Sequence, residues 1–92
     1  MKGLYLLIFG TVQGVFFRKS TQEQAIRLNL AGWVRNRADG TVEVYAQGHE
    51  NSLIQLLQWC GKGPPMSKVK KVDIVWSDTL EELKNFEIRQ TI

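Results

Sequence analysis

Apolar residues follow two different periods along this chain, and the changes of period predict its elements. Residues 3–10 are apolar nearly throughout, which is typical of a central strand. The next segment favours a helix over residues 18–29, and Asn29 and Gly32 are its stop signals. The apolar stripe of this helix is formed by residues at helical spacing, namely Phe17, Thr21, Ala25 and Leu28.

A hairpin, a second helix and two further strands are predicted beyond this point. Residues 33–37 and 41–46 read as strands and flank Asp39-Gly40, a pair that favours the positive φ angles of a tight turn. Residues 50–61 predict a helix that ends at the glycines and prolines of residues 61–65, with a stripe of Leu53, Leu56, Leu57 and Cys60. Alternation predicts strands around Val72, Ile74 and Trp76 and then around Phe86 and Ile88.

The resulting order is βαββαβ followed by an extra edge strand at the C-terminal end. This order predicts an α+β fold of the ferredoxin-like type, a two-layer sandwich in which two helices cover one face of an antiparallel sheet. A chain of 92 residues is expected to form a single domain over residues 1–92. Because this fold hosts many unrelated functions, it identifies none of them.

Composition and charge limit the partners and the cellular compartment that we expect for this protein. The formal net charge is +3, which suits an anionic ligand but is too small to indicate a nucleic-acid partner. Cys60 is the one cysteine, so no internal disulfide can form and a reducing cytoplasm is expected. The apolar run over residues 4–9 is too short to span a membrane and reads as a strand rather than a signal peptide. We expect a cytoplasmic monomer with no membrane partner.

The segment Gly10-Thr11-Val12-Gln13-Gly14-Val15-Phe16-Phe17-Arg18 carries the strongest chemical signal. A strand that turns tightly into a helix directs several backbone N–H groups into one concavity, and the helix start adds the positive end of its dipole. Arg18 adds a planar cation that can grip two phosphate oxygens. A cation at a helix start is unfavourable unless an anion binds there. The segment therefore predicts a site for a tetrahedral dianion.

The sequence offers no residues suited to metal binding, to nucleophilic catalysis or to a general base near residues 10–18. His49 lies in a predicted turn and Cys60 lies on an apolar stripe, so neither is expected to be catalytic, and no cluster has metal-ligand spacing. Residues 10–18 lack a Cys, Ser, Asp or His that could act as a nucleophile or base. Two routes remain: water attacks a bound phosphate directly, or the domain only binds. Asn36 is the best candidate to orient water, because an amide both donates and accepts, although it could instead shape the following turn.

Other residues near this segment have simpler interpretations. Phe16 is expected to line the mouth of the site, and Phe17 to pack in the core. Lys68, Lys70 and Lys71 form a basic cluster that we interpret as a solvated strand face.

The segment at residues 10–18 resembles the first signature of the acylphosphatase family: glycine, any residue, Val-Gln-Gly-Val, any residue, an aromatic residue and Arg. The second signature follows in order as Gly32-Trp33-Val34-Arg35-Asn36, Gly40-Thr41-Val42-Glu43 and Gly48. Length and element order agree as well, so the resemblance covers essentially the whole chain. Phe16 is closer to vertebrate-type enzymes, since the common bacterial form has glycine there. The tail after Phe86 is less similar to the family.

The resemblance implies hydrolysis of the carboxyl–phosphate bond of small acyl phosphates, with no metal and no cofactor. Arg18 and Asn36 would be the catalytic residues: Arg18 would bind phosphate oxygens and Asn36 would hold the attacking water. Inorganic phosphate or sulfate would occupy the same site. The phosphate-binding residues carried over from the motif are Gly10, Thr11, Val12, Gln13, Gly14, Val15, Phe16 and Arg18.

Two functions from other classes stay open at this stage. A ferredoxin-like sheet with a positive charge could bind RNA, although the third strand lacks the expected stacking motif around Val42, Val44 and Tyr45. The domain could also sense acyl or carbamoyl phosphates without turning them over. Binding without turnover would identify the sensor, and steeply salt-dependent RNA binding would identify the RNA module.

Overall fold

The computed structural model describes residues 1–79 and 82–92. Its elements follow the predicted order, with boundaries that differ from the expected ones by a few residues. They are β1 (Lys2–Thr11), α1 (Phe17–Arg27), β2 (Ala31–Asn36), β3 (Val42–Gly48), α2 (Glu50–Lys62), β4 (Lys68–Asp78) and β5 (Phe86–Ile88). In the described part of the chain, no helix has the length and apolar character needed to cross a membrane.

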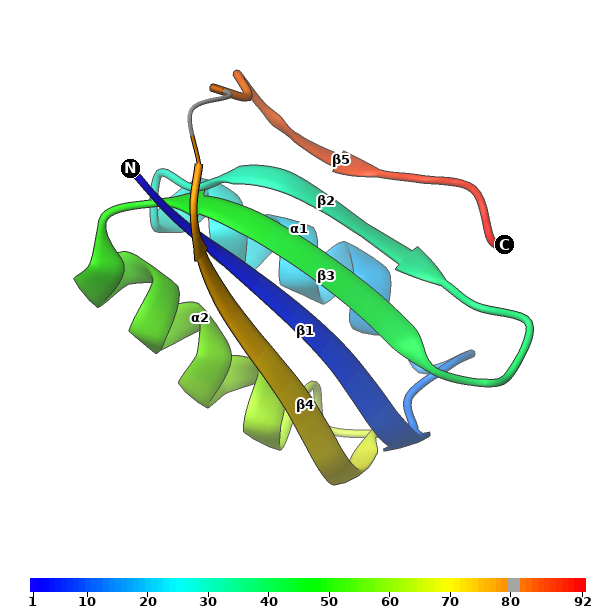
Figure 1. Cartoon of the computed structure of the whole chain (residues 1–92). Helices are drawn as coiled ribbons and strands as arrows, with labels where there is room; N and C mark the ends of the chain where they lie inside the picture. The colour runs from blue at the N-terminus through cyan, green and yellow to red at the C-terminus, as the bar shows by residue number, and fades with distance from the viewer. Residues whose placement is uncertain (80–81) are drawn as a thin grey trace.

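The five strands form one sheet in the order β4-β1-β3-β2-β5. The predicted antiparallel pairing is confirmed for β1 with β3 and β4 and for β2 with β3, whereas β5 pairs with β2 in parallel. The sheet is therefore mixed. Figure 1 shows that β4 ends and β5 begins at the same end of the sheet, on opposite edges. Because β4 and β2 run in opposite directions, a strand that begins at the end where β4 finishes runs parallel to β2.

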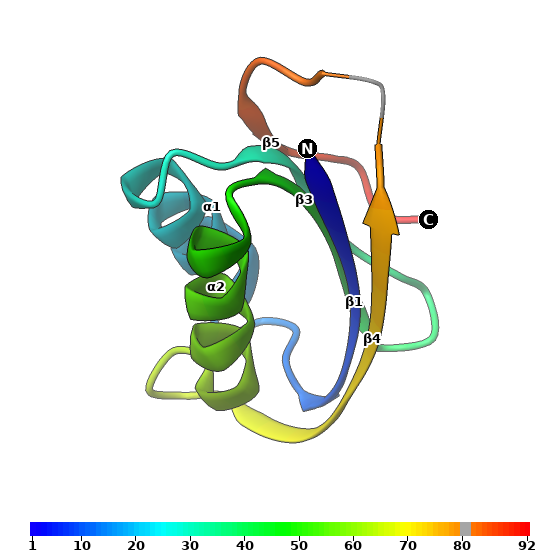
Figure 2. The ribbon, with the colours of Figure 1, turned by 60° about the vertical axis from the view of Figure 1, so that its left-hand side comes forward.

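Both helices cover the same face of the sheet, and the core lies between the two layers (Figure 2). The two central strands β1 and β3 turn alternate residues toward the helices, as their period of two dictates. The predicted apolar stripes of both helices pack against these strand residues. Leu28 and Leu57 of the stripes are only partly buried and lie at the margin of the core. The buried members of this core include Leu4, Leu6, Ile8, Val42, Val44, Ala46, Phe17, Ala25, Leu53, Leu56 and Cys60.

Strand β4 is longer and less buried than its sequence suggested. Register places Ile74 opposite Leu6 and Trp76 opposite Leu4, so both side chains lie on the helix face of the sheet. They nevertheless remain 45% and 40% exposed. The reason is that β4 is an edge strand, with a neighbouring strand on one side only. Alternation along the sequence identifies the inward side of a strand, but it does not show whether that side is fully covered.

Candidate active site

A pocket of about 340 Å³ lies where the 10–18 segment, the start of α1 and the end of β2 meet. It brings together Arg18 and Asn36, the two residues that sequence reasoning placed at the centre of the chemistry. Its lining consists of Val12, Gly14, Phe16, Phe17, Arg18, Lys19, Asn36 and Ile88. A larger cavity of about 820 Å³ lies at the opposite end of the sheet and contains none of the predicted site residues. The smaller pocket is therefore the candidate active site.

The turn between β1 and α1 owes its shape to unusual backbone angles. Gly14 has a φ of 73° and Phe16 a φ of 63°, both in the left-handed region. Glycine adopts this region freely, but for a residue with a side chain it is strained. Phe16 is also 78% exposed, so packing does not explain its conformation. Backbone strain of this kind is concentrated at functional sites, and here it lies in the segment predicted to bind the anion.

Gly10 fixes the place where this turn begins. The pairing of β1 with β4 shifts register between Phe9 and Gly10. A Cβ atom on Gly10 would overlap the carbonyl oxygen of Lys68, and the φ of Gly10 is 134°. Only glycine therefore allows the end of β1 to approach β4 this closely.

The start of α1 has features that would favour a bound anion. Within the described residues, no side chain caps this helix, and its first turn contains no acidic residue. The N–H groups of the first turn are therefore left to an outside acceptor. Arg18 and Lys19 stand in that turn and line the pocket, although cations there oppose the helix dipole. A bound phosphate would satisfy the N–H groups and reverse the unfavourable interaction.

Asn36 is the last residue of β2, and its pairing partner on β3 is Val42. Val34, two residues earlier, is fully buried on the helix face, so the period of two directs the Asn36 side chain to that face as well. Hydrogen bonds that shape the following turn come from Asp39, whose Oδ1 accepts from Thr41 N at 3.0 Å and Thr41 Oγ1 at 2.6 Å. Asp39 therefore supplies hydrogen bonds that shape this turn, and Asn36 is among the residues that line the pocket.

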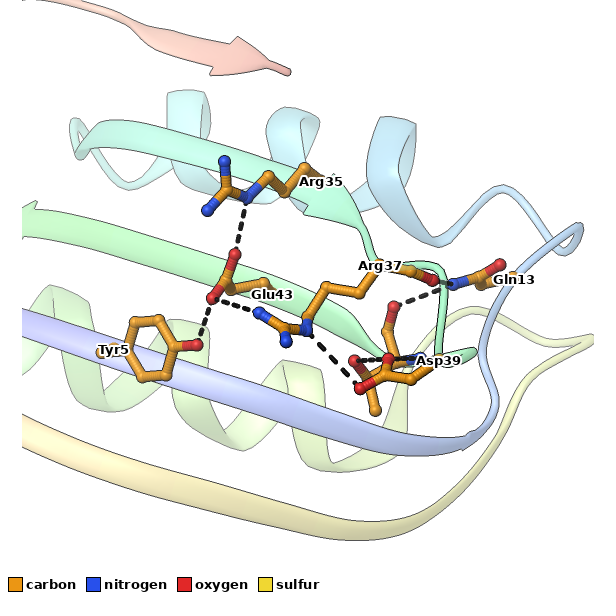
Figure 3. Close-up of polar contacts among 7 residues, drawn as sticks. Tyr5, Gln13, Arg35, Arg37, Asp39 and Glu43 are labelled. Atoms are coloured by element: carbon orange, nitrogen blue, oxygen red, sulfur yellow. Dashed lines mark hydrogen bonds and ion pairs between the residues drawn. The ribbon is translucent and has the colours of Figure 1, made fainter. Parts of the chain in front are cut away.

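Gln13 ties residues 10–18, the candidate anion-binding segment, to the β2–β3 hairpin (Figure 3). Its Nε2 donates to the carbonyl oxygen of Arg37 at 2.7 Å and to that of Thr41 at 2.9 Å. Arg37 directly follows Asn36 in the chain. The Gln13 side chain thus fixes the spacing between the two halves of the site. Sequence reasoning placed Gln13 among the backbone donors, and it missed this side-chain role because the hairpin is distant in sequence.

On the other face of the sheet, Glu43 organises the same hairpin (Figure 3). The carboxylate, only 5% exposed, accepts from Tyr5 and from Arg35 Nε at 2.6 Å, and it pairs with Arg37 at 3.4 Å. Burial alone would raise the pKa of Glu43, but these hydrogen bonds and the two arginine charges outweigh it and lower the pKa below its usual value. Burial and the bond to Glu43 raise the pKa of Tyr5 to about 12.

The remaining candidate groups lie away from the pocket. Cys60 is buried in the core, and burial raises the pKa of its thiol to about 12, so it supplies no thiolate near neutral pH. His49 lines the larger cavity instead. Over residues 1–79 and 82–92, no group of three or more His, Cys, Asp or Glu residues is placed to hold a metal ion.

Three lining residues were not among the predicted site residues, namely Phe17, which was expected to pack in the core, Lys19 and Ile88. Lys19 lines the pocket beside Arg18, and its position in the first helical turn was a usable signal. Ile88 belongs to β5, the edge strand that pairs with β2. No local pattern around Ile88 indicates that it reaches the anion-binding segment.

The sequence profile of the acylphosphatase family matches residues 4–88. The chain belongs to the acylphosphatase family. A curated acylphosphatase from Thiobacillus denitrificans is 47% identical over 89 residues, which cover 97% of this chain and 98% of the relative. One from Pelotomaculum thermopropionicum is 42% identical over 84 residues, covering 91% of each chain. The crystal structure of acylphosphatase from Bacillus subtilis superposes with a TM-score of 0.94 at 40% identity, covering 97% of this chain and 99% of that one.

Proposed function

We propose that this acylphosphatase-family protein hydrolyses the carboxyl–phosphate bond of small acyl phosphates and needs no metal ion or cofactor. The observation that carries the proposal is the pocket itself. It joins an uncapped, cationic helix start to Asn36, a neutral side chain that can hold water. Sequence relatives that carry the acylphosphatase name over nearly the whole chain support the same reaction. They give no support to the sensor or RNA-binding alternatives.

The phosphate group would sit against the backbone N–H groups of residues 10–16 and the first turn of α1. Arg18 would grip two of its oxygens with the guanidinium fork. These donors stabilise the charge on the equatorial oxygens as the phosphoryl group loosens from its leaving group. A fixed cation and a helix dipole supply the positive charge that a metal ion provides in many phosphoryl-transfer sites, which is why we propose metal-independent catalysis.

Asn36 would orient the attacking water in line with the bond that breaks. The side-chain carbonyl accepts a hydrogen bond from the water, and the amide N–H₂ can donate to a phosphate oxygen. A bond forms between the water oxygen and phosphorus, and the bond between phosphorus and the acyl oxygen breaks. The carboxylate leaves with the electron pair, and a phosphate oxygen takes the proton from the water. Because a carboxylate is a good leaving group, positioning and charge stabilisation suffice.

We further propose that the protein works as a monomer in the reducing cytoplasm. The single cysteine, Cys60, is buried as a free thiol and takes no part in the proposed reaction.

A hydrolysis assay with benzoyl phosphate in the presence of a chelator tests this proposal. Arg18→Ala should lose both phosphate binding and turnover. Asn36→Ala should lose about 100-fold or more in kcat while inorganic phosphate still inhibits at nearly the wild-type concentration.

Arg27→Ala and Asn51→Ala are the matched controls, because they remove the same residue types from helices α1 and α2 outside the pocket. Full turnover by Asn36→Ala would show that water is positioned by another group. Phosphate binding without hydrolysis by the wild type would identify a sensor instead.

A further inference from the structure

Cations without an ion-pair partner gather at the end of the molecule that holds the pocket. Lys71, by contrast, pairs with Asp73 at 3.3 Å and lies over the ring of Phe9. Arg37 of the hairpin is likewise paired, with Asp39 and Glu43. The remaining positive side chains of that end form no ion pair with any described residue. They are Arg18 and Lys19 in the first turn of α1, Lys62 at the end of α2, and Lys68 and Lys70 at the start of β4.

Three of these lysines surround the anion-binding segment without lining the pocket. Lys68 is the pairing partner of Thr11, which belongs to that segment. Lys70 follows two residues later, and both side chains are exposed. Lys62 precedes Gly63, where an added Cβ would meet the ring of Phe17 at 2.7 Å. Figure 2 shows the two connections, residues 12–16 and 63–67, at the same lower end of the molecule.

The side-chain carboxylates toward the pocket end are paired with cations, and the unpaired ones among the described residues lie farther from the pocket. Toward this end, Asp39 and Glu43 are engaged by Arg37 and Asp73 by Lys71. An oxygen of the terminal residue Ile92 accepts a hydrogen bond from Ala38 N of the hairpin. Exposed Glu23, for which no ion pair with a described residue is found, lies in the middle of α1. Exposed Glu50 and Glu82, for which no ion pair with a described residue is found, lie at the other end, at the start of α2 and in the segment before β5. A dianion approaching the protein therefore meets an attractive field around the pocket.

We propose that Lys62, Lys68 and Lys70 form an electrostatic capture patch, which draws the dianionic substrate toward the anion-binding segment. The patch accelerates encounter and strengthens binding, and it touches no reacting atom. The identity of the substrate rests on the function proposed above, whereas the patch itself acts on any small dianion, inorganic phosphate included. The basic cluster that the sequence suggested to be a solvated face thus gains a role for two of its three lysines.

The test compares two double variants that remove the same charge from opposite ends of the sheet. Lys68→Gln/Lys70→Gln alters the patch, and Lys2→Gln/Lys84→Gln is the control. Steady-state kinetics with benzoyl phosphate and calorimetric binding of inorganic phosphate are measured in sodium chloride at about 0.01 M and about 1 M ionic strength, where the Debye length is about 30 Å and about 3 Å.

The patch variant should lose about three- to tenfold in kcat/KM and in phosphate affinity at low salt, with kcat unchanged. At high salt it should converge with the wild type, and the control pair should behave as the wild type throughout. Equal losses in the control pair, a fall in kcat, or wild-type phosphate affinity that is insensitive to salt would overturn the proposal. If benzoyl phosphate is not hydrolysed, the function proposed above fails, and phosphate affinity alone still decides whether the patch exists.

Discussion

Removing the Gln13 side chain should weaken both the fold and the reaction, because that side chain connects the two halves of the site. Gln13→Ala deletes two hydrogen bonds, at 2.7 and 2.9 Å. Neither acceptor is left unpaired, since Arg37 O still accepts from Gly40 N and Thr41 O from Arg37 N. At about 0.5–1.5 kcal/mol for each net hydrogen bond, we expect a loss of about 1–3 kcal/mol in the free energy of unfolding.

Urea denaturation measures this loss directly, and Gln55→Ala, an exposed glutamine of α2, is the control expected to change stability by less than about 0.5 kcal/mol. Gln13→Glu should destabilise more than Gln13→Ala near neutral pH, because its carboxylate would face two carbonyl oxygens. In both Gln13 variants kcat should fall more than phosphate affinity, since the hairpin that carries Asn36 is released. Unchanged stability together with unchanged kcat would refute the linking role of Gln13.

Three further predictions rest on single residues. Phe16→Gly should be more stable than Phe16→Ala by about 0.5–1 kcal/mol in urea unfolding, because only glycine relieves the left-handed backbone strain; equal stabilities would argue against that strain. Glu43→Gln should lower the free energy of unfolding at neutral pH, and the difference from the wild type should shrink as pH falls below about 4. The reason is that the lowered pKa of Glu43 contributes stability, which is lost when the carboxylate of the folded protein is protonated. A difference that does not depend on pH would contradict this. Cys60 should react with a thiol reagent only as fast as the protein unfolds, and prompt labelling would show that it is accessible.

Much of the fold follows from local pattern. Strong periodicity placed both helices, and Asp39-Gly40 placed the hairpin, because these signals depend on neighbouring residues only. The parallel pairing of β5 with β2 was not predictable in this way. It depends on where the chain goes after β4, and alternation around Phe86 and Ile88 carries no information about the partner strand. The exposure of Ile74 and Trp76 has the same cause, since coverage is a property of the assembled layers.

The residues of the candidate site also fall into two groups, those with a local sequence signal and those that depend on tertiary contacts. The glycines and Arg18 are local signals of an anion-binding turn, and the structure places Arg18 in one pocket with Asn36. By contrast, the side-chain role of Gln13 depends on carbonyl groups of the distant hairpin. Ile88 reaches the pocket only because β5 lies beside β2. Sequence therefore indicates which residues have the right chemistry, and tertiary packing decides which of them meet.

The measurement that tests the central claim most directly is the position of bond cleavage. Benzoyl phosphate is hydrolysed by the wild-type protein in ¹⁸O-labelled water, and the ¹⁸O content of both products is measured by mass spectrometry. If water held at Asn36 attacks phosphorus, as we propose, the enzymatic reaction places the label in inorganic phosphate and none in benzoate. Label in benzoate would show attack at the carbonyl carbon and would contradict the account.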